Sequence, residues 1–362
     1  MLIRYNSKKD AKNRALSFSM TDTATDSRAG FLPPLRTDVK TIAVFLEKKP
    51  FFGAIIVHIP FLHALRRIYP GAKLVVLSPA PAMELLAKTG AADRFVLYEW
   101  NFSGIRRTLQ DIAPELVFVL RPASRGLDLA VASCRVPASA SYHSWLGRLL
   151  YSRIVPQNSG IYRARKYLTL LTDAAAAGTL PLDGWFREAA SRAALSTAAW
   201  GRTLAVLPGG GAGGFKRWGE ANYLELCARL SALDPGLEFL WILGPQEAGL
   251  EEKVLASPLA AKSRILAGAM LPDLAAAAFA CAGAVGNDCG PAHVFHMCGL
   301  PYTCVMSDLD GRAARCADEW LDAPNRPFAV LSAPGRPISE VGVETVAGMV
   351  WKMLPPRPSP ST

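Results

Sequence analysis

The chain has 362 residues, 51% hydrophobic and 19% charged, a composition typical of α/β enzymes and long enough for two domains with separate cores. No apolar run reaches the roughly 18 residues that cross a bilayer, and the amino terminus lacks the apolar segment of a signal peptide. The net charge of +10 is uneven, because residues 1–200 hold 27 Lys and Arg against 14 Asp and Glu. We therefore expect a cytoplasmic protein whose first half meets an anionic partner.

Cysteine and histidine spacing argues against a metal site or a disulfide framework. The seven cysteines include no CxxC pair, and His293 and His296 lie three residues apart without an acidic companion. We expect free thiols, no bound metal and no cofactor.

The first half alternates between apolar runs and helical patterns. A polar, basic leader is expected at 1–37, followed by an N-terminal domain at 38–180. Within that domain, strands are predicted at 40–46, 73–78, 94–100, 115–121 and 138–143, with helices at 55–71, 83–90, 104–112 and from about 126. Pro60 predicts a kink or a late start of the first helix.

The alternation restarts after a linker at 181–200, in a C-terminal domain at 201–353. Strands are predicted at 203–210, 238–244, 264–268, 283–287 and 301–307, with helices at 221–233, 247–256, 271–283 and 292–299; a proline-rich tail, 354–362, follows. Strands that alternate with helices indicate parallel sheets with right-handed crossovers. The prediction is an α/β protein of two doubly wound Rossmann-like domains facing across a cleft, the architecture called GT-B.

The stretch GAVGNDCGPAHVFHMCGLPYTCVMS, 283–307, predicts a strand, a tight turn and a helix. Pro291 suits the start of that helix, and Gly299 its end. A turn of this kind directs unpaired backbone N–H groups to one point, which attracts phosphates. The alternative is an ordinary strand–helix turn with Asp288 as helix cap.

A glycine-rich loop opens the second domain, in LPGGGAGGFKRWGEANYLEL, 207–226. Gly209, Gly211 and Gly214 satisfy the dinucleotide pattern GxGxxG, but Lys216, Arg217 and Trp218 intervene before the next helix and no acidic residue ends the next strand. A loop that wraps a diphosphate fits better, with Lys216 opposing its charge. Trp218 would then anchor the loop or stack on a ligand.

After the next strand, Gln246 and Glu247 could contact a ribose or base, or belong to a solvated loop.

These segments resemble glycosyltransferase family 9, the heptosyltransferase-like enzymes of lipopolysaccharide assembly. NDCGPAHVFHMCGLP, 287–301, is similar to the family's NDTGPMHLAAALGKP, and 207–226 is similar to its PG…K-R-W segment. GAIIVHIPFLHALRRIYPGAKLVVL, 53–77, stands where the family has a GD…P.L..L…YP stretch. The resemblance covers roughly residues 38–310. It implies a GT-B fold and an inverting, metal-independent sugar transfer from a nucleotide diphosphate sugar, commonly ADP-heptose but ADP- or UDP-linked here.

The resemblance also implies roles for single residues. Lys216 would contact the diphosphate, Asp288 would bind hydroxyls of the donor sugar, and His293 would face the nucleotide or pack in the core. The donor-binding set is Gly210, Gly211, Lys216, Gln246, Asp288, Cys289, Gly290, Pro291 and His293.

The chain departs from the family where catalysis is expected. The family's general base, an Asp after the first helix's glycine, is Ala54 here. Two substitutes are visible: His58, on the same face if this stretch is one helix, and Glu47, just after the first strand. Cys289 replaces a threonine, which removes a hydroxyl donor from the loop. Residues 308–312 replace a G-P-T turn, so the acceptor or donor specificity is expected to differ from that of heptose transfer.

The predicted function is sugar transfer to a lipopolysaccharide or other anionic glycolipid or polysaccharide, with peripheral association with the inner membrane surface. Candidate acceptor contacts are basic residues of the first domain: Arg66, Arg67, Arg121, Arg163, Arg165 and Lys166. The alternative is a donor-binding scaffold that has lost catalysis at Ala54. Nucleic acid is not expected as a partner, because charge alone supports it and no recognition motif does.

Overall fold

The computed structural model describes residues 31–121, 124–144, 146–156, 160–197, 200–211, 213–308, 311, 313–322, 328–332 and 334–356. Residues 1–30 of the predicted leader and 357–362 of the predicted tail lie outside them, as do Leu309, Asp310 and Arg312 of the segment that replaces the family's G-P-T turn. No helix of the described residues is long and apolar enough to cross a membrane.

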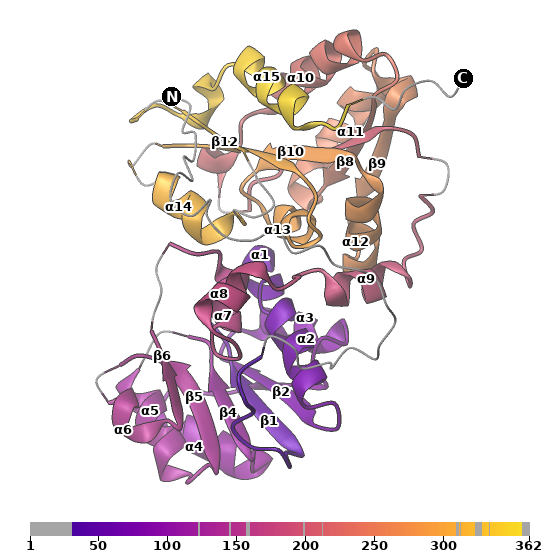
Figure 1. Ribbon diagram of the computed structural model, residues 1–362. Coiled ribbons are helices and arrows are strands. Elements are labelled where there is room, and N and C mark those ends of the chain that lie inside the picture. Colours follow the sequence, from indigo (N-terminus) through magenta and orange to yellow (C-terminus); the bar gives the residue numbers. More distant parts are fainter. Residues whose placement is uncertain are drawn as a thin grey trace, which may run out of the picture.

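Two parallel six-stranded sheets form the framework (Figure 1). The first contains β1 Thr41–Phe45, β2 Lys73–Ser78, β3 Arg94–Leu97, β4 Leu116–Val119, β5 Ala138–Tyr142 and β6 Arg153–Val155. The second contains β7 Thr203–Leu207, β8 Glu238–Leu243, β9 Ser263–Ala267, β10 Gly283–Asn287, β11 Tyr302–Met306 and β12 Phe328–Leu331. The orders β3-β2-β1-β4-β5-β6 and β12-β11-β10-β7-β8-β9 are the same doubly wound topology. The prediction of two Rossmann-like domains is confirmed.

The apolar runs become strands because helices cover the sheets. β7, β10 and β11 are buried at every residue, as parallel strands between two helical layers must be. The first domain's helices are α1 Phe52–Ile56, α2 Ile59–Ile68, α3 Leu85–Lys88, α4 Phe102–Ile112, α5 Arg125–Ser133 and α6 Gly147–Leu150. Those of the second are α10 Glu220–Leu233, α11 Ala248–Leu255, α12 Leu271–Ala280, α13 Gly290–Met297, α14 Ala313–Trp320 and α15 Val343–Met353.

Three short helices connect the domains: α7 Arg163–Leu168, α8 Ala174–Thr179 and α9 Gly184–Ala190. Helix α9, in the predicted linker, packs against α2 of the first domain and α12 of the second. Part of the predicted leader, residues 31–37, is held to the rest of the chain by hydrogen bonds. Leu32 N donates to Leu171 O at 2.8 Å, and Arg153 donates to Pro33 O at 2.6 Å.

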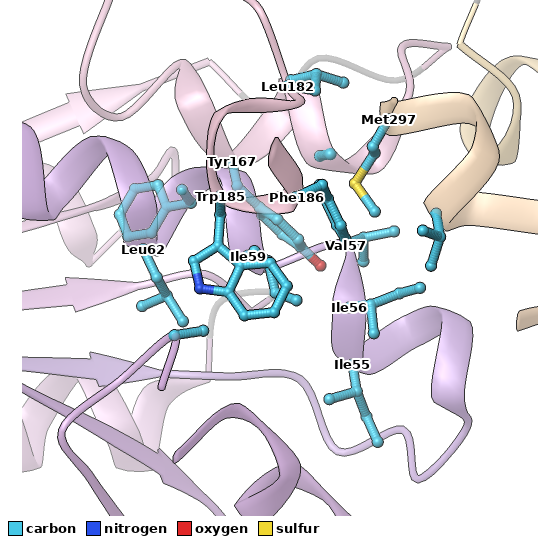
Figure 2. Packing of buried hydrophobic residues seen from close by; sticks show 14 of the residues in the cluster. Ile55, Ile56, Val57, Ile59, Leu62, Tyr167, Leu182, Trp185, Phe186 and Met297 are labelled. Carbon is cyan, nitrogen blue, oxygen red and sulfur yellow. The ribbon is translucent and has the colours of Figure 1, made fainter. Parts of the chain in front are cut away.

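The domains share one cluster of buried hydrophobic residues. Figure 2 shows Met297 of α13 approaching Phe186 of α9 and Val57 of the first domain. In Figure 1, α1 and α13 meet at the boundary between the two domains. The segment around Ala54 and the helix after the Asp288 turn therefore lie against one another.

Candidate active site

The topology concentrates two loops of the second domain at one place. β7 and β10 are neighbours in the sheet, and the strand order reverses between them, which is where doubly wound sheets bind ligands. The glycine-rich loop follows β7, and the turn Asp288–Pro291 follows β10. Both predicted donor segments thus converge.

Asn287, the last residue of β10, ties these loops together. Its Oδ1 accepts hydrogen bonds from Tyr223 Oη at 2.8 Å and Trp218 N at 3.3 Å. Its Nδ2 donates to Pro208 O at 2.7 Å and Gly209 O at 3.2 Å. No role was predicted for Asn287, although a polar side chain at the end of the otherwise apolar strand GAVGN indicates a buried hydrogen-bonding position.

Lys216 and Asp288 form an ion pair, with Nζ 2.5 Å from Oδ2. They come from the two different loops and both remain partly exposed. The partly exposed ammonium of Lys216, close to the start of α13, offers the positive charge that a diphosphate requires. The structure thus brings together the two residues that the resemblance places at the donor.

Glycine is required in the loop at Gly210, where a Cβ would lie 2.9 Å from Arg217 Cγ, whereas Gly211 has open space around it. Arg217 bonds to Gln246 and lies 3.7 Å from Glu247. Glu247 is buried, and its Oε2 accepts from Gly244 N at 3.1 Å. Gln246 and Glu247, the two predicted ribose or base contacts, therefore face Arg217, for which no role was predicted.

Trp218 anchors the loop. It is fully buried, and its Nε1 donates to Val341 O at 2.7 Å. Its ring meets Tyr223 edge to face, with centroids 4.9 Å apart. The anchoring role is confirmed, and the burial leaves no face to stack on a ligand.

The turn before α13 lies against the first domain. A Cβ at Gly290 would lie 2.6 Å from Cδ1 of Phe52, so only glycine allows α1 to approach this closely. Cys289 is buried at the helix cap without a side-chain cap bond, and burial raises the pKa of its thiol to about 12. Pro291 lies in the first turn, and the helix ends before Gly299, whose φ is +81°.

The first domain shows a different arrangement around Ala54. The stretch 55–71 is not one helix: α1 ends at Ile56 and α2 begins at Ile59, with Pro60 in its first turn. The late start that Pro60 predicted is confirmed, because proline cannot donate the backbone hydrogen bond of a helix interior. The condition for placing His58 on the face of Ala54, a single helix through this stretch, is therefore not met.

His58 lies inside the first domain. It is fully buried, its Nδ1 contacts Ile55 O at 3.0 Å, and its ring stacks on Tyr167 at 4.6 Å. Burial, the largest cause, lowers its pKa from 6.5 to about 4. The imidazole is therefore neutral near pH 7.

Glu47, after β1, is buried and held by partners from α7. Arg163 forms an ion pair with its carboxylate, and Tyr167 Oη donates to Oε1 at 3.1 Å. The Arg163 guanidinium also lies 4.6 Å from the centre of the Trp320 ring and 3.6 Å from Glu319. Glu47 thus belongs to a charged cluster that joins α7 to α14.

His293 is buried at the domain boundary. Its Nδ1 lies 3.2 Å from Tyr162 Oη, and its ring is 5.4 Å from that of Trp320. Burial lowers its pKa from 6.5 to about 4.

Most of the candidate acceptor residues already have partners. Arg66 pairs with Asp93 at 3.1 Å, and Arg165 pairs with the buried Asp322 at 2.6 Å. Arg67 and Lys166 lie over the rings of Phe31 and Tyr142. Arg121 differs. It lies 3.6 Å over the Trp100 ring and beside the Tyr98 hydroxyl, and its Nε and Nη1 are buried without a hydrogen-bond partner among the described residues.

The described residues contain no group of three or more His, Cys, Asp or Glu that could hold a metal ion. All seven cysteines lie among the described residues, and none of them forms a disulfide bond.

Residues 139–301 match the model of glycosyltransferase family 9 (heptosyltransferase). The resemblance to this family is confirmed. The matched region holds the glycine-rich loop, Lys216 and the Asp288 turn. No curated protein sequence matches the chain.

Solved structures with the same fold include members of this family. E. coli ADP-heptose lps heptosyltransferase II is 18% identical with a TM-score of 0.56, over 86% of this chain and 98% of that one. E. coli heptosyltransferase WaaC with ADP-2-deoxy-2-fluoro heptose is 15% identical with a TM-score of 0.60, over 86% and 99%. A putative UDP-N-acetylglucosamine 2-epimerase from Listeria monocytogenes is 12% identical with a TM-score of 0.53, over 86% and 87%. At these identities the likeness shows the GT-B fold.

Proposed function

We propose that this protein is an inverting, metal-independent glycosyltransferase that takes a sugar from a nucleotide diphosphate sugar. The observation that carries the proposal is the pair Lys216–Asp288, 2.5 Å apart, at the point where the loops after β7 and β10 meet. E. coli heptosyltransferase WaaC has been solved with ADP and with ADP-2-deoxy-2-fluoro heptose, which supports an ADP-linked donor such as ADP-heptose.

The chemistry follows from the charges at this site. The diphosphate leaves with growing negative charge, which the ammonium of Lys216 and the N–H groups at the start of α13 oppose. In the structure the carboxylate of Asp288 is paired with Lys216. When a diphosphate binds the ammonium of Lys216, Asp288 would turn to the hydroxyls of the donor sugar. Gly210 lets the loop backbone come close, and Asn287 holds the loop in place.

The acceptor would be an anionic glycolipid or polysaccharide bound by the first domain. Arg121 supports this proposal most directly, because no described residue forms a hydrogen bond with its buried Nε and Nη1, which could bind a phosphate or carboxylate. It follows β4, which neighbours β1 where the strand order of the first sheet reverses. Such an acceptor would bring the protein to the inner membrane surface from the cytoplasm.

The second candidate function is a donor-binding scaffold without catalysis. Ala54 favours it, because that position lacks the carboxylate that the family resemblance places there. Both candidates require donor binding, and only the transferase releases nucleotide.

Calorimetric titration with ADP-heptose and UDP-N-acetylglucosamine tests the donor site. Lys216→Ala and Asp288→Ala should each weaken binding by about 2 kcal/mol, on the order of 30-fold. The control is Lys253→Ala, which removes a lysine that pairs at 2.5 Å with Glu220 on the exposed surface of the same domain. Equal affinity in all three variants would remove the donor-site assignment.

A further inference from the structure

The imidazole of His293 touches the backbone beside Ala54. His293 lies in α13 of the second domain, and Gly53 lies in α1 of the first. A Cβ at Gly53 would lie 2.5 Å from Cδ2 and 3.0 Å from Nε2 of His293. The ring edge that carries Nε2 therefore faces the helix start where a catalytic carboxylate is missing.

Tyr162, just before α7, orients this ring. Its hydroxyl lies 3.2 Å from Nδ1, and the two ring planes are 14° apart. In the tautomer with the proton on Nδ1, the ring donates to the Tyr162 oxygen and the Nε2 lone pair faces Gly53.

The electrostatic surroundings keep His293 neutral. Burial is the largest cause that lowers its pKa to about 4; Lys216 and Arg163 lower it further, and Asp288 raises it. Tyr162, Trp320 and His296 also face the ring. His293 is therefore neutral near pH 7, with the lone pair of Nε2 free to accept a proton.

We propose that His293 is the general base that replaces this carboxylate, an inference that rests on the proposed transferase function. Nε2 takes the proton of the acceptor hydroxyl while that oxygen forms a bond to the anomeric carbon of the sugar. The bond from the anomeric carbon to the diphosphate oxygen breaks, and its electron pair leaves with the nucleoside diphosphate. The carboxylate of Asp288 stabilises the imidazolium that results.

The other two candidates are less well placed. His58 stacks on Tyr167 inside the first domain, and Glu47 is paired with Arg163 and Tyr167. His293 instead lies between the donor turn and α1. Because Gly53 and Gly290 bring these two helix starts into contact, substrates would bind here as α1 and α13 separate, with His293 beside both.

The test measures ADP release from ADP-heptose with water as acceptor, using the full chain. His293→Gln should lower kcat by about 10²- to 10⁴-fold and leave donor affinity within about threefold. His296→Gln is the matched control, because this second buried histidine of α13 packs on Tyr302, and it should retain the native kcat. Adding Ala54→Asp to His293→Gln should restore at least about tenfold of the lost kcat.

Tyr162→Phe provides a second route if His293→Gln does not fold. Tyr162 is a positioning residue, so its loss should lower kcat by about tenfold with KM unchanged, which a purely structural defect would not do. Native kcat in Tyr162→Phe would count against the proposal.

Three results would overturn it. His293→Gln could keep the native kcat, or the double variant could bind donor and regain no turnover. The native chain could bind donor and release no ADP while Ala54→Asp alone does, which supports the scaffold. A native chain that binds no ADP-heptose contradicts the proposed function itself, and this inference with it.

Discussion

The two domains have the same strand order, yet their equivalent edges differ chemically. In the second domain the strand reversal between β7 and β10 brings together Lys216, Asn287 and Asp288. In the first domain the reversal between β1 and β4 places Glu47 and Arg121 at the corresponding edge, and the first turn of the helix after β1 contains Gly53 and Ala54. The topology therefore decides where ligands can bind, and individual side chains decide what chemistry occurs there.

The two edges also differ in how their polar groups are satisfied. On the proposed donor side, Asn287 holds the loops while Lys216 and Asp288 stay partly exposed. On the proposed acceptor side, Glu47 is closed off by Arg163, which lies 116 residues away in the chain. The loops of the proposed donor side are therefore held within one domain, whereas the proposed acceptor side depends on the segment that connects the domains.

Asn287→Ala tests the preformed donor side and should have the largest effect on stability. It removes four hydrogen bonds and leaves buried partners unsatisfied, so the free energy of unfolding should fall by about 4 kcal/mol. Urea denaturation measures this. The control Asn222→Ala loses one bond, to Trp218 O, and should cost about 1 kcal/mol. Equal losses in the two variants would contradict the central role of Asn287.

His58→Gln tests the buried acceptor side through pH. Because the pKa of His58 is about 4 in the fold against 6.5 ordinarily, the unfolded chain binds its proton more readily. Protonation of His58 in the unfolded chain therefore lowers the free energy of unfolding by about 3 kcal/mol as the pH falls from 6.5 to 4, whereas above pH 6.5 no such loss occurs. Glu47, Arg163 and Tyr167 face this ring.

Unfolding free energies at pH 7 and pH 4.5 should therefore differ less in His58→Gln than in the native protein. The exposed His143 provides the control, since His143→Gln should keep the native dependence. An unchanged pH dependence in His58→Gln would mean that His58 is not held neutral by the fold.

Arg121→Gln tests whether the first domain holds an anionic acceptor. We expect binding to micelles of phosphorylated lipid A to weaken by about 1.4 kcal/mol, or tenfold, because the lipid phosphate loses its hydrogen bonds to the guanidinium of Arg121. Arg229→Gln, which removes an arginine paired with Glu225 at 2.8 Å in the second domain, is the control. The same loss in both variants would indicate nonspecific charge attraction.

Trp218→Phe should have the smallest effect. It removes the hydrogen bond to Val341 O, at a cost of about 1 kcal/mol, and keeps an aromatic ring against Tyr223. Donor affinity, measured by titration with ADP-heptose, should stay native because the ring has no exposed face. A marked loss of affinity would place Trp218 at the ligand.

Local patterns were sufficient for much of the fold and for the loops of the proposed donor site. Continuous apolar runs predicted most of the strands, and the Lys216 loop and Asp288 turn were both singled out. β6, β12, α14 and α15 were not predicted. β6 has three residues, too few for a periodic signal, and the other three lie beyond the last predicted strand. Leu32 and Pro33 were assigned to the leader because their partners, Leu171 and Arg153, are distant in sequence.

By itself, the sequence determined the two α/β domains, the two loops of the proposed donor site and the absence of a carboxylate at position 54. Each of these depends on periodicity or on neighbouring residues. Only the tertiary structure decided that His58 is enclosed, that Glu47 is paired with α7, and that His293 meets Gly53 and Tyr162. Tyr162 and His293 are 131 residues apart, so no local pattern relates them, and their contact exists only because the two domains pack together.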